Sequence, residues 1–324
     1  MIGSISKIRP CGHHHHYKYS SCVNVDDFSR IDRDYKNDID ENGLWYFNTD
    51  NAINCTNLLR SSPANIIEVK LNLPNATSIS YSLYGCSKLK KVFVDAPKVT
   101  DLYGVIYHCS NLEEFKMPDS SKVTALGYFA ETTTKWLNIS GLDFSNVTNI
   151  GNGFNSNAGY LYNSKIEADF SNVIYANRAF SYRILTELKY PVDENGVCIY
   201  NKGAGKQAII NGIPQYKYNT FPNLSEGSEM FSTSRLDKKS TISILESLPA
   251  YTSGSHPITI GIHIDHKYDP EVNVALKKCQ NSYITPIEEL GATLPEEITT
   301  DKGWTLTVQW NGTATGNAYP APTV

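Results

Sequence analysis

The densest set of potential metal ligands lies near the N-terminus, in the stretch CGHHHHYKYSSC from Cys11 to Cys22. Thiolate and imidazole groups are the ligands that zinc prefers, and alternate members of His13–His16 together with Cys11 or Cys22 could surround one ion. Four consecutive histidines cannot all face the same ion, and the spacing matches no recognised zinc motif. A solvated or interface loop is the preferred interpretation, an expression tag is an alternative, and no metal or other cofactor is predicted.

Two shorter patterns resemble pieces of known sites. The GAGK stretch at 203–206 is similar to part of a phosphate-binding loop, but Gln207 stands where that loop requires Ser or Thr. His263 and His266 lie in HIDH at the end of an expected strand and lack a third ligand. The chain carries no nucleophile elbow, metalloprotease motif or suitably spaced carboxylate pair. The sequence therefore predicts a protein that is not an enzyme.

Charge and hydropathy exclude several classes of partner. The formal net charge is -4, and no run of Lys and Arg exceeds two residues, so the basic surface that binds nucleic acid is missing. No window approaches the roughly 18 consecutive apolar residues of a membrane span. The first fifteen residues lack the apolar stretch of a signal peptide. We therefore predict no nucleic-acid partner, no membrane insertion and no Sec-type export.

A four-residue frame, C-S-K-L at Cys86, returns as C-S-N-L at Cys109. A disulfide, a pair of metal ligands or two copies of one structural position would each explain this return. The chain has seven cysteines, an odd number, and neither Cys86 nor Cys109 belongs to a C-x-x-C pair or a Cys/His knuckle, which argues against the first two explanations. Self-similarity favours the third. An apolar anchor precedes each frame by three residues and recurs at intervals of 23 to 26 residues, at Leu83, Ile106, Phe129, Phe154 and Phe180.

Each repeat predicts two brief strands followed by a tight turn. In the repeat after Cys86, apolar residues alternate across a D-A-P turn, at Leu89, Val92 and Val94 and then at Val99 and Leu102. One such unit cannot bury its own apolar face, so stacking on neighbours must create the core. Cys86 and Cys109 are interpreted as small buried apolar residues of one column, which continues as Thr132, Asn157 and Arg183.

These columns resemble a known family. The pattern L-x-x-V-x-V, V-T-x-L, (I/F)-x-x-C-x-x-L resembles the BspA-like leucine-rich repeat, and FSNVTNIGNGF at Phe144 resembles its relative, the 26-residue bacterial surface-protein repeat. The resemblance covers residues 51–236, with departures where the Cys column ends and where an insertion near 192–214 interrupts the repeats. It implies a β-rich α/β fold, a leucine-rich-repeat solenoid of 23–26 residue repeats used for adhesion or recognition.

The remaining segments are assigned from patterns other than the repeat. Residues 237–311 predict a strand-helix-strand cap, with one helix capped by Ser240 and another beginning at Asp269-Pro270, and residues 312–324 form a polar tail. The sequence of this C-terminal segment is similar to that of repeat proteins carried by gut bacteria and their phages. Residues 1–50 match no repeat column and are interpreted as an attachment segment, in which LWYF at 44–47 packs on the first coil.

Three tyrosines are the candidate partner-binding residues. Tyr84 and Tyr107 each follow a buried anchor by one position, so their rings should emerge side by side, and Tyr128 lies close to the same line. Adjacent aromatic rings make a platform for protein or sugar. The alternative is that these amphipathic rings only cover the edge of the core.

Three functional interpretations follow from these features. The favoured one is a structural protein of a bacteriophage virion, such as a tail, fibre or surface decoration component, because a repeat protein without a signal peptide can reach the outside of a cell through lysis. Its partners would be other virion proteins or a host cell-surface protein or glycan, and it could be a homo-oligomer. The alternative is a secreted adhesin at the bacterial cell surface. The third, an enzyme, has no supporting constellation.

Overall fold

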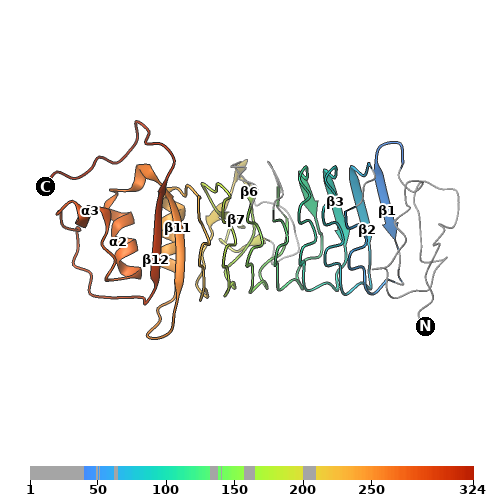
Figure 1. The fold of residues 1–324 in the computed structure, drawn as a ribbon, viewed down its shortest axis with the longest axis horizontal. Coiled ribbons are helices and arrows are strands. Elements are labelled where there is room, and N and C mark those ends of the chain that lie inside the picture. The colour runs from blue at the N-terminus through green and yellow to red at the C-terminus, as the bar shows by residue number, and fades with distance from the viewer. Residues whose placement is uncertain are drawn as a thin grey trace.

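A computed structural model shows an elongated stack of coils that ends in a helical unit at the C-terminal side (Figure 1). The structure describes residues 40–48, 50, 52–61, 65–131, 138–139, 141–156, 165–199 and 209–324. The Cys11 to Cys22 stretch, the GAGK stretch at 203–206, and most of the segment 1–50 lie outside these described residues.

One face of the stack is a six-stranded parallel sheet whose strands follow the order of the chain. Its strands are β1 (Leu44–Asn48), β2 (Glu68–Asn72), β3 (Lys91–Asp95), β4 (Glu114–Lys116), β5 (Asn138–Ile139) and β6 (Lys165–Ile166). Glu68 pairs with Lys91, and Lys91 pairs with Glu114, so each strand lies one repeat beyond its neighbour.

The sheet begins earlier than the sequence boundary at residue 50. β1 pairs in parallel with β2 along its whole length, with Leu44 opposite Glu68. Trp45 and Phe47 alternate inward, are buried, and stack with their ring centroids 5.2 Å apart. The segment 44–47 is therefore the first strand of the stack and not a separate cover over it, because its alternating apolar residues continue the core face of β2.

In the repeats that the structure describes, the second predicted strand does not form. Val99 and Leu102 are buried, but the chain around them makes only an isolated parallel bridge from Asp101 to Ala125. The Asp101 carboxylate accepts a hydrogen bond from the Tyr103 N–H at 2.9 Å, which bends the chain before a ladder can extend. Bridges in this column continue from Ala125 to Asn149, Tyr175 and Glu226. Neighbouring coils are joined on this side by single bridges and by further backbone hydrogen bonds, such as those from the Gly104 N–H to the Gly127 carbonyl at 3.0 Å and from the Ile106 N–H to the Phe129 carbonyl at 3.0 Å.

The anchor residues lie in the centre of the stack. Each has a relative exposure of 0%: Leu83, Ile106, Phe129, Phe154 and Phe180. Phe154 and Phe180 stack with centroids 5.5 Å apart and ring planes 6° apart, and Phe231 continues the column at 5.3 Å and 9°. The core is therefore continuous along the stack, since each coil buries its apolar face only against its neighbours.

The column that contains Cys86 and Cys109 has a polar role that the sequence interpretation missed. The Cys86 thiol donates to the carbonyl oxygen of Leu59 at 3.2 Å, and the Cys109 thiol donates to that of Leu83 at 3.0 Å. Arg183, in the same column, donates through Nε to the carbonyl oxygen of Phe154. These three side chains therefore each donate to a carbonyl oxygen of the preceding coil. The other two members of the column, Thr132 and Asn157, lie outside the described residues.

Every coil also turns through left-handed backbone at an equivalent position. The φ angles in this column are 55° at Tyr81, 61° at Gly104, 52° at Tyr128, 57° at Asn152, 58° at Arg178 and 55° at Glu229. Such a conformation costs a non-glycine residue about 1–2 kcal/mol. Because residues as different as Tyr, Arg and Glu adopt it, stacking on the neighbouring coils, and not local preference, imposes the turn.

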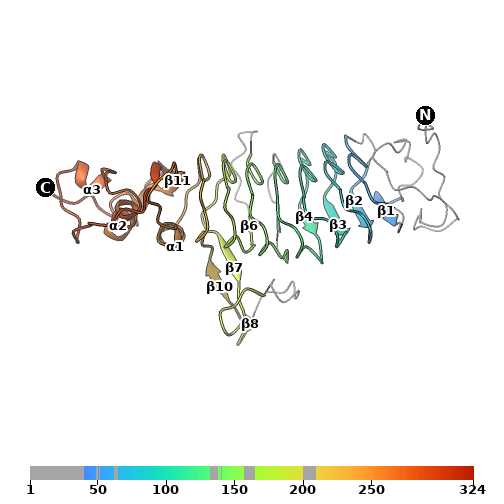
Figure 2. The same ribbon diagram turned by 90° about the horizontal axis from the view of Figure 1, so that it is seen from below.

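The insertion projects sideways from the stack (Figure 2). It begins with β7 (Lys189–Pro191), which pairs antiparallel with β10 (Tyr216–Tyr218), and it carries the hairpin of β8 (Ile209–Ile210) and β9 (Ile213–Pro214). The insertion thus extends from Lys189 to Tyr218, beyond the predicted range of 192–214. The coils before and after the insertion are direct neighbours in the stack, because the Phe180 N–H donates to the Met230 carbonyl at 2.9 Å.

The C-terminal unit closes the end of the stack. It contains α1 (Lys238–Ser247), β11 (Pro257–His263), the 3-10 helix η2 (Ile264–His266), α2 (Pro270–Cys279), α3 (Pro286–Glu289) and β12 (Thr305–Asn311). β11 and β12 pair in parallel. β11 also joins the last coil, where the Gly227 N–H donates to the Pro257 carbonyl at 2.8 Å and the Leu236 N–H to the Gly261 carbonyl at 3.1 Å.

The helix caps of this unit were predicted with mixed success. Asp269 and Pro270 are the N-cap and first residue of α2, as predicted, and the Asp269 carboxylate accepts from the Val272 N–H at 3.1 Å. The prediction that Ser240 caps α1 is wrong. Asp237 is the N-cap, and its carboxylate accepts from the Ser240 N–H at 2.8 Å, which places Ser240 inside the first turn.

The polar tail at 312–324 is tied to the C-terminal unit. Thr315 donates its N–H to the Asp265 carboxylate at 2.8 Å, and the Tyr319 N–H donates to the Asp265 carbonyl at 3.0 Å. Hydrogen bonds from Thr315 lower the pKa of the Asp265 carboxyl. None of the helices in the described ranges has the length and apolar content needed to cross a bilayer.

Candidate recognition surface

A ridge of tyrosine rings runs across neighbouring coils. Tyr84 and Tyr107 lie with ring centroids 5.0 Å apart, and Tyr128 lies 5.9 Å from Tyr107. The structure adds Tyr81 and Tyr103, which lie 5.3 Å from each other, with Tyr103 at 5.5 Å from Tyr128. All five side chains are half-buried. These five residues are called the tyrosine ridge below. The interval search missed Tyr81 and Tyr103, because they are 22 residues apart and do not occupy equivalent positions of their coils.

The N-terminal end of the ridge carries a cation and an imidazole. The Arg60 guanidinium carbon lies 4.5 Å from the Tyr84 ring centroid and 5.0 Å from that of Tyr81, within cation–π range. The His108 ring stacks on Tyr107, with centroids 4.1 Å apart. Burial lowers the pKa of His108 from its ordinary value near 6.5, so its ring is mostly neutral at pH 7.

The phenol groups of Tyr103 and Tyr107 stay protonated far above neutral pH. A hydrogen bond with Tyr81, together with burial, raises the pKa of Tyr103 to about 12. Burial, followed by the nearby Glu131 carboxylate, raises the pKa of Tyr107 to about 12. Tyr103 and Tyr107 therefore present neutral hydroxyl groups and ring faces rather than charge, while Arg60 supplies a cation at the end of the ridge.

Glycine residues make room for the ridge. A Cβ atom added to Gly104 would lie 2.5 Å from Cδ1 of Tyr81, and one added to Gly127 would lie 2.8 Å from Cδ2 of Tyr103. Each tyrosine ring thus lies over the glycine of the next coil, which has no side chain to displace it.

Gly104→Ala is expected to destabilise the protein by about 1–3 kcal/mol, because it adds an overpacked contact with Tyr81 to a strained φ of 61°. Gly212→Ala is the matched control, since its φ of 76° is also positive but nothing lies within 4 Å of the added Cβ. Urea unfolding of both variants measures the difference. Equal destabilisation would show that Tyr81 does not lie over Gly104.

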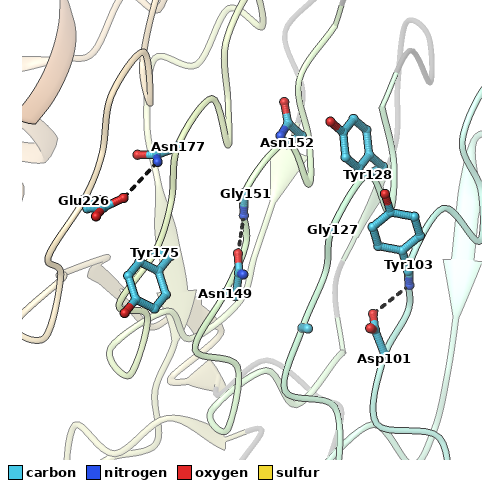
Figure 3. A pocket seen from close by; sticks show the side chains of 11 residues that line it. Asp101, Tyr103, Gly127, Tyr128, Asn149, Gly151, Asn152, Tyr175, Asn177 and Glu226 are labelled. Atoms are coloured by element: carbon cyan, nitrogen blue, oxygen red, sulfur yellow. Dashed lines mark hydrogen bonds between the residues drawn. The ribbon is translucent and has the colours of Figure 1, made fainter.

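A groove of about 440 Å³ lies beside the ridge and crosses several coils (Figure 3). Tyr103 and Tyr128 stand at one end and Tyr175 at the other, with Asn149 and Gly151 between them. The remaining lining residues are Asp101, Ala125, Gly127, Asn152, Asn177 and Glu226. The Tyr175 side chain is 47% exposed, so its ring is open to a ligand.

The polar side chains of the groove are held in place by the coils. Asn177 donates to the Glu226 carboxylate at 3.1 Å and accepts from the Ser228 N–H at 3.0 Å, while Asn149 accepts from the Gly151 N–H at 2.9 Å. Burial raises the pKa of the Asp101 carboxyl, although a backbone hydrogen bond from Tyr103 opposes this. The lining contains no Lys or Arg, so the groove itself carries only acidic charge.

The two carboxylates of the groove are too far apart to form a hydrolytic pair. Asp101 and Glu226 belong to one bridged column and are separated in it by Ala125, Asn149 and Tyr175. Four coil spacings of ~4.8 Å place their backbones ~19 Å apart. A pair of carboxyl groups that hydrolyses a glycosidic bond lies roughly 5–10 Å apart. The arrangement is suited to binding.

Of the histidines named from the sequence as candidate metal ligands, the structure describes His263 and His266. His263 and His266 lie with ring centroids 6.1 Å apart, and Nδ1 of His263 accepts from the Asp265 N–H at 3.1 Å. Within the described residues, no group of three or more His, Cys, Asp or Glu side chains could hold a metal ion. The five cysteines that the structure describes are buried.

Comparison with protein-family models, with curated proteins and with solved structures found no match.

Proposed function

We propose that this chain is a non-enzymatic structural protein of a bacteriophage virion, in a tail, fibre or surface decoration, and that it uses a leucine-rich-repeat solenoid to recognise another protein or a host surface. The observation that carries the recognition part is the tyrosine ridge with its adjoining groove. Rings from successive coils are held against one another on a stack whose core is continuous, so the surface is preorganised before any partner binds.

The virion assignment is supported by the resemblance of the repeats and of the C-terminal sequence to proteins of gut bacteria and their phages. A secreted bacterial surface adhesin is the alternative, because the same repeats serve adhesion there. Antibodies raised against residues 40–324 would separate the two. Labelling of particles released by lysis is the expected result in cultures that carry the gene, and labelling of intact cells without particles would replace the virion assignment by the adhesin.

Replacing Tyr84 and Tyr107 together by serine is expected to weaken binding to the partner surface by about tenfold or more, since two adjacent ring faces are removed. Adsorption of particles that carry the variant measures this effect. The Tyr84→Phe, Tyr107→Phe double variant keeps both rings and is expected to bind normally. Thermal unfolding checks that both variants are folded. Unchanged adsorption of the serine variant would leave the rings as a cover for the core edge.

A further inference from the structure

We infer that the groove between Tyr103 and Tyr175 binds an uncharged glycan that lies along the stack. This inference rests on the proposed recognition function and specifies the chemical class of one ligand. The groove combines an exposed aromatic ring, amide groups and carboxylates over a floor with glycines, at Gly127 and Gly151. Ring faces suit the C–H faces of a pyranose, and the amides and carboxylates suit its hydroxyl groups.

The charge of the groove selects among glycans. Asp101 and Glu226 are the charged residues of the lining, and no Lys or Arg lines the groove to offset them. An anionic polysaccharide would bring like charges together in a partly desolvated site, which is unfavourable. An uncharged sugar meets no such repulsion, and carboxylates accept hydrogen bonds from its hydroxyl groups.

The backbone of the groove argues against an extended peptide as the ligand. The N–H groups of Leu102, Leu126 and Ile150 donate to the carbonyl groups of Ala125, Asn149 and Tyr175 in the next coil, at 3.1, 2.9 and 2.9 Å. Addition of a peptide strand requires a free row of such groups. Recognition in this groove must therefore come from side chains, as it does for sugars.

The repeat of the stack supplies the last argument. Equivalent backbone positions recur once per coil, at the ~4.8 Å spacing of paired strands, although the side chains at these positions differ. A pyranose unit of an extended chain has a similar length. Asn149 and Asn177 belong to successive coils and occupy offset positions along the groove (Figure 3). Successive coils can therefore each offer a polar or aromatic side chain to successive sugar units.

The test uses the full chain on an array of uncharged oligosaccharides of glucose, galactose, mannose and N-acetylglucosamine, with sialylated and sulfated oligosaccharides as comparators. Binding of at least one uncharged oligosaccharide, and none of the anionic ones, is the expected result. Titration calorimetry with the best ligand then measures the affinity of the wild-type protein and of its variants. Failure to bind any uncharged oligosaccharide on the array would overturn the inference.

Two variants locate the ligand. Tyr175→Ala removes an exposed ring and is expected to weaken binding about tenfold. Gly151→Leu places a side chain in the groove, and its Cβ would meet only Oδ1 of Asn149 at 3.2 Å and the carbonyl of Asn177 at 3.6 Å, so it should block binding without unfolding the coil. Tyr182→Ala is the matched control, because Tyr182 is 43% exposed but does not line the groove. Loss of binding in Tyr182→Ala but not in Tyr175→Ala would overturn the assignment to the groove.

The outcomes separate this inference from the proposed function. Sugar binding by the purified chain, lost in Gly151→Leu, supports the inference even if the chain is absent from particles, in which case the virion assignment alone is lost. Conversely, if particles require Tyr84 and Tyr107 for adsorption but the chain binds no uncharged sugar, recognition stands and the glycan inference falls. Selection of a displayed peptide that Gly151→Leu excludes, without sugar binding, would also overturn the glycan inference.

Discussion

Phe154→Ala is expected to lower the free energy of unfolding by about 3–5 kcal/mol, the cost of removing a buried aromatic ring from a closed core. The Phe154 side chain is fully buried, and its ring lies 5.5 Å from that of Phe180 and 6.0 Å from that of Phe129. The cavity would lie between coils, so it weakens contacts to both neighbours. Because each coil is stabilised by its neighbours, the two halves of the stack should also unfold less cooperatively.

Urea unfolding followed by far-UV circular dichroism and by fluorescence measures both effects, and separate transitions from the two probes would show the loss of cooperativity. Phe93→Ala is the control, because Phe93 lies on β3 and is 37% exposed. Its cost should stay within about 1 kcal/mol. If the two variants were equally stable, the anchor column would not be the core.

Arg183→Met is expected to cost about 3 kcal/mol, because each buried carbonyl that loses its donor costs about 1–3 kcal/mol. The Arg183 guanidinium is buried and donates to the carbonyl oxygens of Phe154, Ala130 and Asn155, the last two at 3.4 and 3.5 Å. Burial lowers its pKa to about 10, so the group is still charged at pH 7. Relief from burying that charge offsets part of the loss. Methionine keeps the unbranched aliphatic part of the side chain.

Arg178→Met is the matched control for this second variant. The Arg178 side chain is 44% exposed, and its ion pair with Glu229, at 3.4 Å, is exposed as well, so less than about 1 kcal/mol should be lost. Chemical unfolding at pH 7 compares the two variants. A loss in Arg183→Met no larger than that in Arg178→Met would mean that water, and not Arg183, satisfies these carbonyl groups.

The interval between like residues was sufficient to predict which side chains face the centre of the coils. Leu83, Ile106 and Phe129 were assigned from their spacing alone, and all three are buried, because in a stacked structure an apolar position must recur wherever the chain passes the core. The N-cap of α2 could also be predicted from the sequence, since Asp269 and Pro270 act within a single helical turn. These are features in which the cause lies within one repeat or one turn.

The contacts between one coil and the next could not be predicted in the same way. Cys86, Cys109 and Arg183 look unrelated as side chains, and their shared role appears only when the carbonyl of the preceding coil lies beside each of them. The left-handed turn at Arg178 contradicts its local preference and is imposed by stacking.

The groove depends on contacts between coils even more strongly. Asp101, Tyr175 and Glu226 are far apart in the chain, and the insertion separates the last two, yet bridges between coils place all three in one column. By itself the sequence determined the period, the inward face and the cap of α2, because these depend on neighbours along the chain. The tertiary structure decided the donor column, the turns and the groove, because each requires atoms that a different coil supplies.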